Sequence, residues 1–163
     1  MLFLALTAKE LGKKLVTFLE QEGLDPANGP APRAVAEGFR ERVDSLSQMA
    51  KKCRYCYEDF DEIEPKAQKK HLRPVVLEPM RDVLEELSNL EQWTTDAIDQ
   101  AIKSIAERHE IGFGKLGQPI RVAVTGSSVS PPIDVTLHLV GRDRSCKRIE
   151  FAIGIIVERA WAS

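Results

Sequence analysis

Two cysteines separated by two residues, Cys53 and Cys56, have the spacing of a chemical site. A structural zinc site needs four ligands, usually supplied by two such pairs, and this sequence has a single pair. Cys146 stands alone. Positions three apart share one face of a helix, so both thiols could simply be buried. We therefore expect no metal site. A zinc enzyme is the alternative, and metal analysis of the purified chain would test it.

Residues 114–117 (GKLG) match a phosphate-binding loop only in part. A P-loop requires GxxxxGK[ST] after a strand, and here a leucine follows the lysine. We expect these glycines to form a turn between helices. The acidic residues in 59–64 lack the glycine and spacing of a calcium loop, which predicts a solvated loop. No nucleophile elbow, HExxH or GxGxxG is present, so we predict no catalytic residues.

Arginines are the more informative residues. Arg40 and Arg42 fall beside the apolar face of a predicted helix, and Arg121 begins a segment that is otherwise apolar. A guanidinium stays charged and must find an acceptor or solvent. Composition leaves two interpretations open. One is a salt bridge to a carboxylate, and the other is a donor fork for a phosphate or an unstacked base.

The elements that must position these residues are predicted to be helices. Apolar residues recur at helical spacing in residues 10–22, 33–52, 66–90 and 94–110, with breaks or kinks at Pro74 and Pro79 and a cap at Thr94. Residues 55–65 have no clear period, which predicts a loop. Residues 133–139 alternate like a strand, but the cap at 130–132, Gly141 and a cap at Asp143 favour two helices. We predict an all-α fold.

Composition limits the class of protein. The chain has 163 residues, 43% hydrophobic and 29% charged, typical of one globular domain or two small ones. The longest apolar run, residues 1–6, is too short for a bilayer that needs about 20 residues, and it lacks the basic flank of a secretory signal. With three cysteines we expect a cytoplasmic, disulfide-free protein with no membrane partner.

The net charge of -2 hides an asymmetry along the chain. Residues 1–110 carry 16 basic and 21 acidic side chains, whereas residues 111–163 carry 7 and 4. A basic C-terminal part is compatible with a polyanionic partner.

One segment carries a family resemblance. Residues 115–126 (KLGQPIRVAVTG) resemble the KhGQPhRVAhTG signature near the C-terminus of bacterial glutamyl-tRNA synthetases. Further segments resemble the same family in the same order, namely RERVDSL at 40–46, AQKKHLRP at 67–74, SPPI at 130–133 and GRDRS at 141–145. Together the resemblance covers about residues 8–158.

The resemblance implies the C-terminal, all-helical anticodon-binding region of a class I aminoacyl-tRNA synthetase. Such regions have two small helical subdomains, for which we expect residues 1–64 and 65–163. The family's catalytic domain, with its HIGH-like and KMSKS-like signatures, is absent from this sequence. We therefore expect no cofactor in this chain and no activity from the chain alone. ATP and Mg²⁺ belong to the catalytic domain of the parent glutamate–tRNA ligase.

Roles carry over residue by residue from the resemblance. Arg42 and Arg121 are expected to reach anticodon bases, and Ile133 to cover a base face. Thr125, Ser130 and Pro131 are expected to line the same pocket. Beyond the roles carried over from the family, four basic residues are expected to hold phosphates: Arg142, Arg144, Lys147 and Arg148. Phosphate contacts position an RNA without specifying its sequence.

The implied partner is the anticodon loop of tRNA(Glu), bound by a monomer. The alternative from a different class is a helical protein-interaction module without RNA specificity. Such a module would show an apolar groove and no salt-dependent RNA binding.

Overall fold

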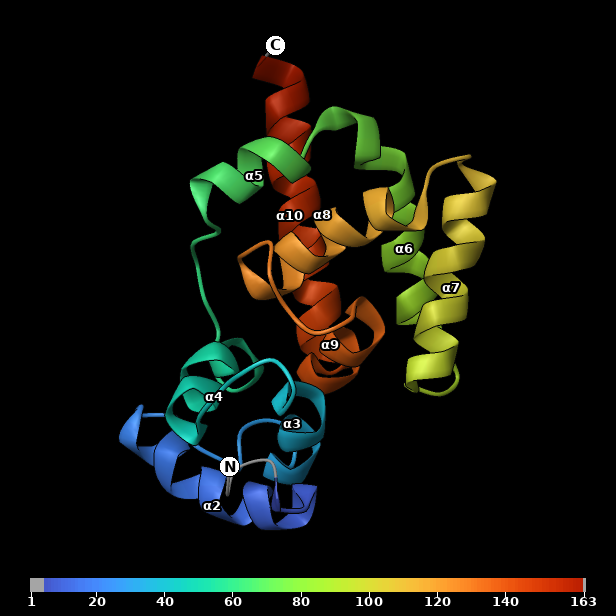
Figure 1. The fold of residues 1–163 in the computed structure, drawn as a ribbon. Helices are drawn as coiled ribbons and strands as arrows, with labels where there is room; N and C mark the ends of the chain where they lie inside the picture. Colours follow the sequence, from blue (N-terminus) through green and yellow to red (C-terminus); the bar gives the residue numbers. More distant parts are fainter. Residues whose placement is uncertain (1–4, 163) are drawn as a thin grey trace. The chain divides into compact units, whose positions relative to one another are not determined.

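The computed structural model describes residues 5–162, so four of the residues in the apolar run 1–6 lie outside the described part. Helices and short 3₁₀ turns make up its regular structure, and no strand occurs within residues 5–162 (Figure 1). The predicted all-α class is confirmed. Backbone contacts divide the chain into two compact units, Met1–Phe60 and Asp61–Ser163. The division into functional subdomains at residues 64 and 65 stays a prediction.

The first unit is built around α2 (Ala8–Gln21), which packs against α3 (Pro32–Phe39) and α4 (Leu46–Lys52). A capping box starts α2, because the Thr7 hydroxyl accepts from the Glu10 backbone N–H at 3.1 Å and the Glu10 carboxylate accepts from the Thr7 N–H. The predicted apolar stripe is confirmed. Its leucines at positions 11, 15 and 19 are fully buried.

The prediction of a single helix over residues 33–52 is wrong, because the segment forms two helices, α3 and α4, with a turn between them. Ser45 has an extended backbone, and its hydroxyl accepts from the Gln48 N–H at 3.1 Å. A serine that caps a new helix in this way competes with continuation of the preceding one. Arg40 and Arg42 therefore lie in a turn after α3 rather than on a helix. The loop predicted for residues 55–65 overlaps a short 3₁₀ turn, η1 (Arg54–Cys56), at its start, and its last residue, Pro65, begins the next helix.

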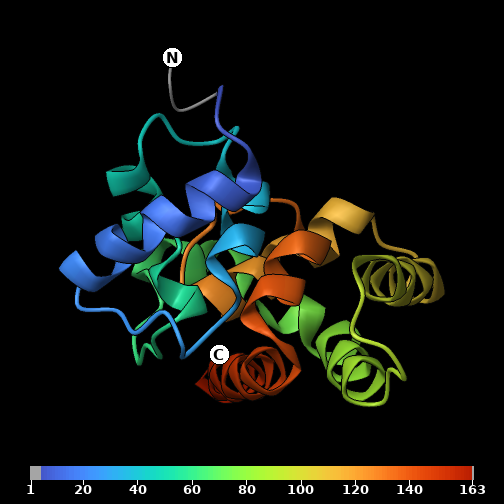
Figure 2. The same cartoon turned by 90° about the horizontal axis from the view of Figure 1, so that it is seen from below.

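The second unit contains seven further elements. They are α5 (Pro65–His71), η2 (Pro74–Val76), α6 (Leu77–Ser88), α7 (Thr95–Arg108), α8 (Phe113–Thr125), α9 (Ile133–Val140) and α10 (Arg142–Ala162). The long helix α10 packs against α6, α8 and α9, and α7 packs against the same three helices. Figure 2 looks almost along α10 and α6, which lie side by side in both views.

The helix ends in the second unit agree in part with the sequence analysis. The cap at Thr94 is confirmed, since its hydroxyl accepts from the Ala97 N–H at 3.1 Å. No break occurs at Pro79, because it lies in the first turn of α6, where backbone N–H groups have no partner within the helix. Asp143 likewise lies in the first turn of α10 rather than capping it.

Helices are confirmed over residues 133–140 and 142–162 despite the strand-like alternation. Ile133, Thr136, Leu137 and Val140 are buried, which is the i, i+3, i+4, i+7 pattern of a helix face. No helix within residues 5–162 has the length and apolar content to cross a bilayer.

The turn predicted at residues 114–117 is wrong, since both glycines lie inside α8. Two glycines and Pro119 disfavour a helix there through backbone entropy and a missing N–H donor. Burial of the apolar face outweighs this, with Leu116, Ile120 and Ala123 fully buried at helical spacing. Helix α8 therefore continues from Phe113 to Arg121 and on to its end at Thr125.

Candidate nucleic-acid interface

Arg121 occupies the second-to-last turn of α8 and is half-buried. Gly126 follows the helix with a left-handed φ of 80°, which glycine adopts without steric penalty. The chain then returns along the end of α8. This return brings the Ser130 hydroxyl to the guanidinium, and Arg121 Nε donates to Ser130 Oγ at 2.7 Å.

Behind Arg121 the hydrogen bonds continue into the interior. Ser130 Oγ lies 2.7 Å from the carbonyl oxygen of Pro131 and 3.0 Å from Thr136 Oγ1. Thr136 Oγ1 lies 2.9 Å from the same carbonyl. Ser130 is 8% exposed and Thr136 is fully buried. These residues form a polar cluster, which we call the Arg121 cluster: Arg121, Ser130, Pro131 and Thr136.

Thr136 is the member of this cluster that was not predicted from the sequence. Its signal is a hydroxyl on the buried stripe of α9, three residues after Ile133 and directly before Leu137. A polar group on such a stripe needs an internal partner.

Thr125 lies beside the cluster but bonds within its own turn. Its hydroxyl is 2.8 Å from the Arg121 carbonyl and 2.9 Å from the Ser127 carbonyl, and it accepts from the Ser127 N–H at 3.1 Å. The residue is 9% exposed. Thr125 thus secures the end of α8 next to Arg121.

Ile133 is buried, with 3% of its surface exposed. It lies in the first turn of α9 on the face that packs inward. Burial of this side chain argues against the expectation that it covers a base, because almost none of its surface is accessible. Pro131 is buried as well.

The four basic residues on α10 have different environments. Lys147 is exposed, and Arg144 is half-buried. The Arg142 guanidinium lies 5.4 Å from the centre of the Trp93 ring, a cation–π geometry, and Nη1 donates to the Ser88 carbonyl at 3.3 Å.

Arg148 is the least exposed of these four residues. It is 8% exposed, and its Nη1 donates to the Val124 carbonyl at 2.7 Å. The guanidinium therefore stabilises the C-terminal end of α8, where carbonyls lack helical partners. A phosphate contact by Arg148 does not agree with this burial.

Arg42 belongs to the first unit, which is described by itself. Arg42 is exposed, and its backbone N–H donates to the Phe39 carbonyl at 2.8 Å. The neighbouring Arg40 donates through Nη2 to the Leu6 carbonyl.

Helix α5 brings positive charge to the neighbourhood of α8. The Glu64 N–H donates to the Gly126 carbonyl at 2.9 Å, which joins the start of α5 to the end of α8. The pKa of His71 is lowered by partial burial and by the positive charges of Lys70 and Arg121. Exposed basic residues on and just after this helix are Lys66, Lys69, Lys70 and Arg73. They add positive potential in a region where an RNA backbone would be favoured.

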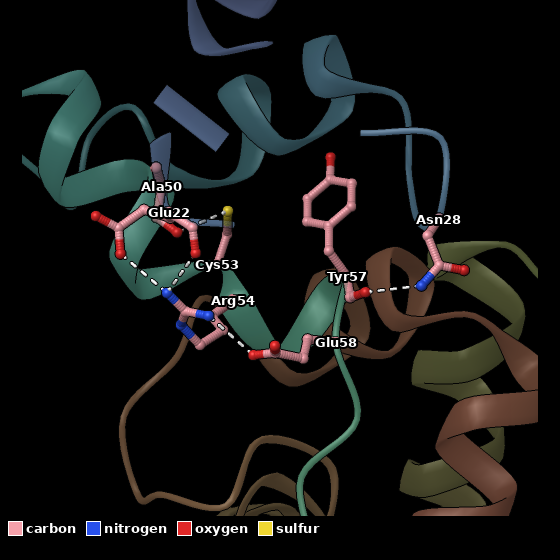
Figure 3. Close-up of polar contacts among 7 residues, drawn as sticks. All are labelled: Glu22, Asn28, Ala50, Cys53, Arg54, Tyr57 and Glu58. Carbon is pink, nitrogen blue, oxygen red and sulfur yellow. Dashed lines mark hydrogen bonds and ion pairs between the residues drawn. The ribbon is translucent and has the colours of Figure 1, made fainter. Parts of the chain in front are cut away.

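The cysteine pair is part of the first unit's core. Cys53 and Cys56 are fully buried, and Cys53 Sγ lies 3.7 Å from the Ala50 carbonyl (Figure 3). Burial raises the pKa of the Cys53 thiol to about 12, so its protonated form is favoured. Residues 5–162 contain no group of three or more His, Cys, Asp or Glu side chains that could hold a metal ion.

Polar contacts close the loop segments around these cysteines. Arg54 pairs with Glu58 and Glu22, each at 2.9 Å, and these hydrogen bonds raise the pKa of Arg54 (Figure 3). Asn28 Nδ2 donates to the Tyr57 carbonyl at 3.0 Å. The surroundings of the cysteine pair are those of a structural core.

The family model of the anticodon binding domain matches residues 5–153. A glutamate tRNA ligase from Elizabethkingia meningosepticum, solved in complex with its amino acid, is similar with a TM-score of 0.84 over 94% of this chain and 18% identity. A glutamate–tRNA synthetase from Elizabethkingia anophelis is similar with a TM-score of 0.76 over 91% of this chain and 18% identity.

At this identity the two structures show a shared fold. The chain spans about 30% of the length of these relatives. The family model is the stronger finding, because it covers nearly the whole described part of the chain. This protein therefore belongs to the anticodon-binding domain family.

Proposed function

We propose that this chain is the anticodon-binding region of a glutamate–tRNA ligase and that it recognises the anticodon loop of tRNA(Glu). The observation that carries the proposal is the match of the anticodon-binding family model to residues 5–153. The similar folds of two glutamate–tRNA ligases support glutamate as the amino acid of the proposed parent enzyme. The parent enzyme would use ATP and Mg²⁺ in a catalytic domain outside this chain, act in cytoplasmic protein biosynthesis, and bind its tRNA as a monomer.

Arg121 is the residue best placed to read a base. Its guanidinium is half-buried and held through Nε by Ser130. Anticodon bases are unstacked and can be read by hydrogen bonds to their edges, and a guanidinium offers planar donors for this purpose. Arg42, exposed on the first unit, is proposed as a second base contact. Arg142, Arg144 and Lys147 are proposed to hold phosphates.

The test is a fluorescence-anisotropy titration of the 163-residue chain with tRNA(Glu) and with a copy carrying a different anticodon, each at two salt concentrations. We expect preference for the cognate tRNA and weaker binding at higher salt. Equal affinity for both RNAs would contradict anticodon recognition by this chain.

Substitutions then separate base contacts from phosphate contacts. Arg121→Ala should weaken cognate binding by about tenfold or more and reduce the preference, on the scale of about 1–3 kcal/mol for a bidentate base contact in DNA. Arg121→Lys keeps the charge but loses the planar fork, so we expect it to lose preference as well.

Lys147→Ala is the matched control on α10. Removing an exposed phosphate contact should weaken both RNAs by the same factor and flatten the salt dependence. If Arg121→Ala behaved like Lys147→Ala, the base-reading role of Arg121 would be rejected.

A further inference from the structure

Thr136 is the innermost member of the Arg121 cluster and a polar residue on an otherwise apolar face of α9. It is fully buried, whereas Arg121 is half-buried at the end of α8. Ser130 lies between them, 2.7 Å from Arg121 Nε and 3.0 Å from Thr136 Oγ1. The two hydroxyls therefore connect the interior of α9 to a surface arginine on a different helix.

The donors and acceptors available to each group fix the direction of the hydrogen bond between Arg121 and Ser130. Arginine Nε is always a donor, so the Ser130 hydroxyl must accept from it. The single proton of Ser130 can then go to the Pro131 carbonyl at 2.7 Å or to Thr136 Oγ1 at 3.0 Å. The Thr136 proton goes to Ser130 Oγ or to the Pro131 carbonyl at 2.9 Å, since this carbonyl has two lone pairs and can accept from both hydroxyls.

Whichever acceptor takes the Ser130 proton, the Ser130 oxygen keeps a lone pair that accepts from Arg121 Nε. The guanidinium is rigid and planar, so fixing Nε also fixes the directions of both terminal amino groups of Arg121. Preorganised donors recognise a partner better because less conformational entropy is lost on binding.

We propose that Thr136 is a positioning residue for anticodon recognition, acting through Ser130 to orient the Arg121 guanidinium. The inference rests on the proposed function, since it assumes that Arg121 reads a base. Thr136 itself is buried and is not proposed to contact RNA.

The test uses the full chain and compares three variants by their discrimination, the ratio of the dissociation constants for the anticodon-swapped and cognate tRNA(Glu). Thr136→Val keeps the branched shape and removes the hydroxyl. We expect it to lower the ratio by about three- to tenfold, the effect of losing one ordinary hydrogen bond. Thr136→Ser restores the hydroxyl and should restore most of the ratio.

Thr94→Ala is the stability control within the same unit. It removes the N-cap hydroxyl of α7, whose hydrogen bond goes to the Ala97 N–H and not to a member of the Arg121 cluster, and should lower the melting temperature while leaving the ratio unchanged. A nitrogen-15 NMR spectrum gives a second measurement. The Arg121 Nε–H signal should be protected from exchange in the unmodified chain and in Thr136→Ser, and lose protection in Thr136→Val.

The outcomes separate the inference from the proposed function. If the unmodified chain shows no cognate preference, both are overturned. If it discriminates and Thr136→Val discriminates equally well, the positioning role of Thr136 is overturned and the proposed function stands. Should Thr136→Val fail to fold, Ser130→Ala takes its place, and an unchanged ratio in that variant would overturn the role of the hydroxyl connection.

Discussion

At the scale of single residues, burial decides what each charged or reactive side chain can do. Lys147 and Arg148 are neighbours on α10, yet one is exposed and the other donates to the Val124 carbonyl inside the second unit. Cys53 is buried in the first unit and donates weakly to the Ala50 carbonyl. A buried thiol is protonated and unreactive, so this cysteine contributes to stability rather than chemistry.

Stability at alkaline pH provides a test of this environment. The pKa of Cys53 is raised by burial from 9.0 to about 12, so the folded state keeps a proton that the unfolded chain releases. The contribution is complete below pH 9 and is lost as the pH rises toward 12. Burial also raises the pKa of Tyr57, which acts in the same direction. Between pH 8.5 and 10.5 we expect a loss of about 1–2 kcal/mol attributable to Cys53.

Urea unfolding of the unmodified chain and of Cys53→Ala at several pH values measures this loss. The variant is expected to be less stable at pH 8 because its core loses packed atoms, but its stability should fall less steeply with pH. Identical pH dependence in the two proteins would contradict the raised pKa of the thiol.

At the scale of elements, periodicity and caps predicted most helices, and long-range burial explains the exceptions. Thr94 and the stripe of α2 could be predicted because their signals are local. The continuation of α8 through two glycines could not, since it depends on burial against helices distant in sequence. The break at Ser45 was hidden by apolar residues that keep helical spacing on both sides of it.

The candidate site follows the same division. Arg121 and Ser130 could be found because they stand in a sequence signature. The role of Thr136 could not, because it depends on how α9 packs against the end of α8. The burial of Arg148 could not be predicted either, because successive residues on a helix turn by about 100°, so the members of a basic run cannot all face one side.

Close packing of two helices in the first unit leads to a prediction at this scale. A Cβ added at Gly12 on α2 would lie 2.6 Å from the backbone nitrogen and 2.8 Å from the Cα of Arg33 on α3. Backbone atoms cannot move aside as the end of a flexible side chain can. Gly12→Ala should therefore lower the free energy of unfolding by about 1–3 kcal/mol despite its better helix propensity.

Gly154→Ala on α10 is the matched control. That glycine is exposed, and apart from its chain neighbours and its own helix backbone no heavy atom lies within 4 Å of an added Cβ, so alanine should stabilise the helix by about 0.5–1 kcal/mol. Urea unfolding measures both. Stabilisation by both substitutions would contradict the close approach of α2 and α3.

At the scale of the whole molecule, the proposed function assigns tRNA recognition to this chain and the charging reaction to a catalytic domain outside it. The chain spans about 30% of the length of two glutamate–tRNA ligases of similar fold, and its family is an anticodon-binding one. Its net charge of -2 does not favour a polyanion, so any RNA affinity must come from a local distribution of charge. The exposed lysines and Arg73 of the α5 region and Lys147 on α10 supply such local positive charge.

If the chain binds tRNA(Glu) through its anticodon, it should compete with a full-length glutamate–tRNA ligase for that tRNA. In charging assays with the chain in excess over tRNA, a concentration equal to its dissociation constant withdraws half of the tRNA. The apparent KM for total tRNA should then rise by about twofold, while kcat stays constant because the enzyme is still saturated once enough tRNA is added. The Arg121→Ala variant should require a higher concentration for the same effect. A fall in kcat at saturating tRNA would instead indicate contact with the enzyme itself, and no effect on charging would argue against tRNA binding by the chain alone.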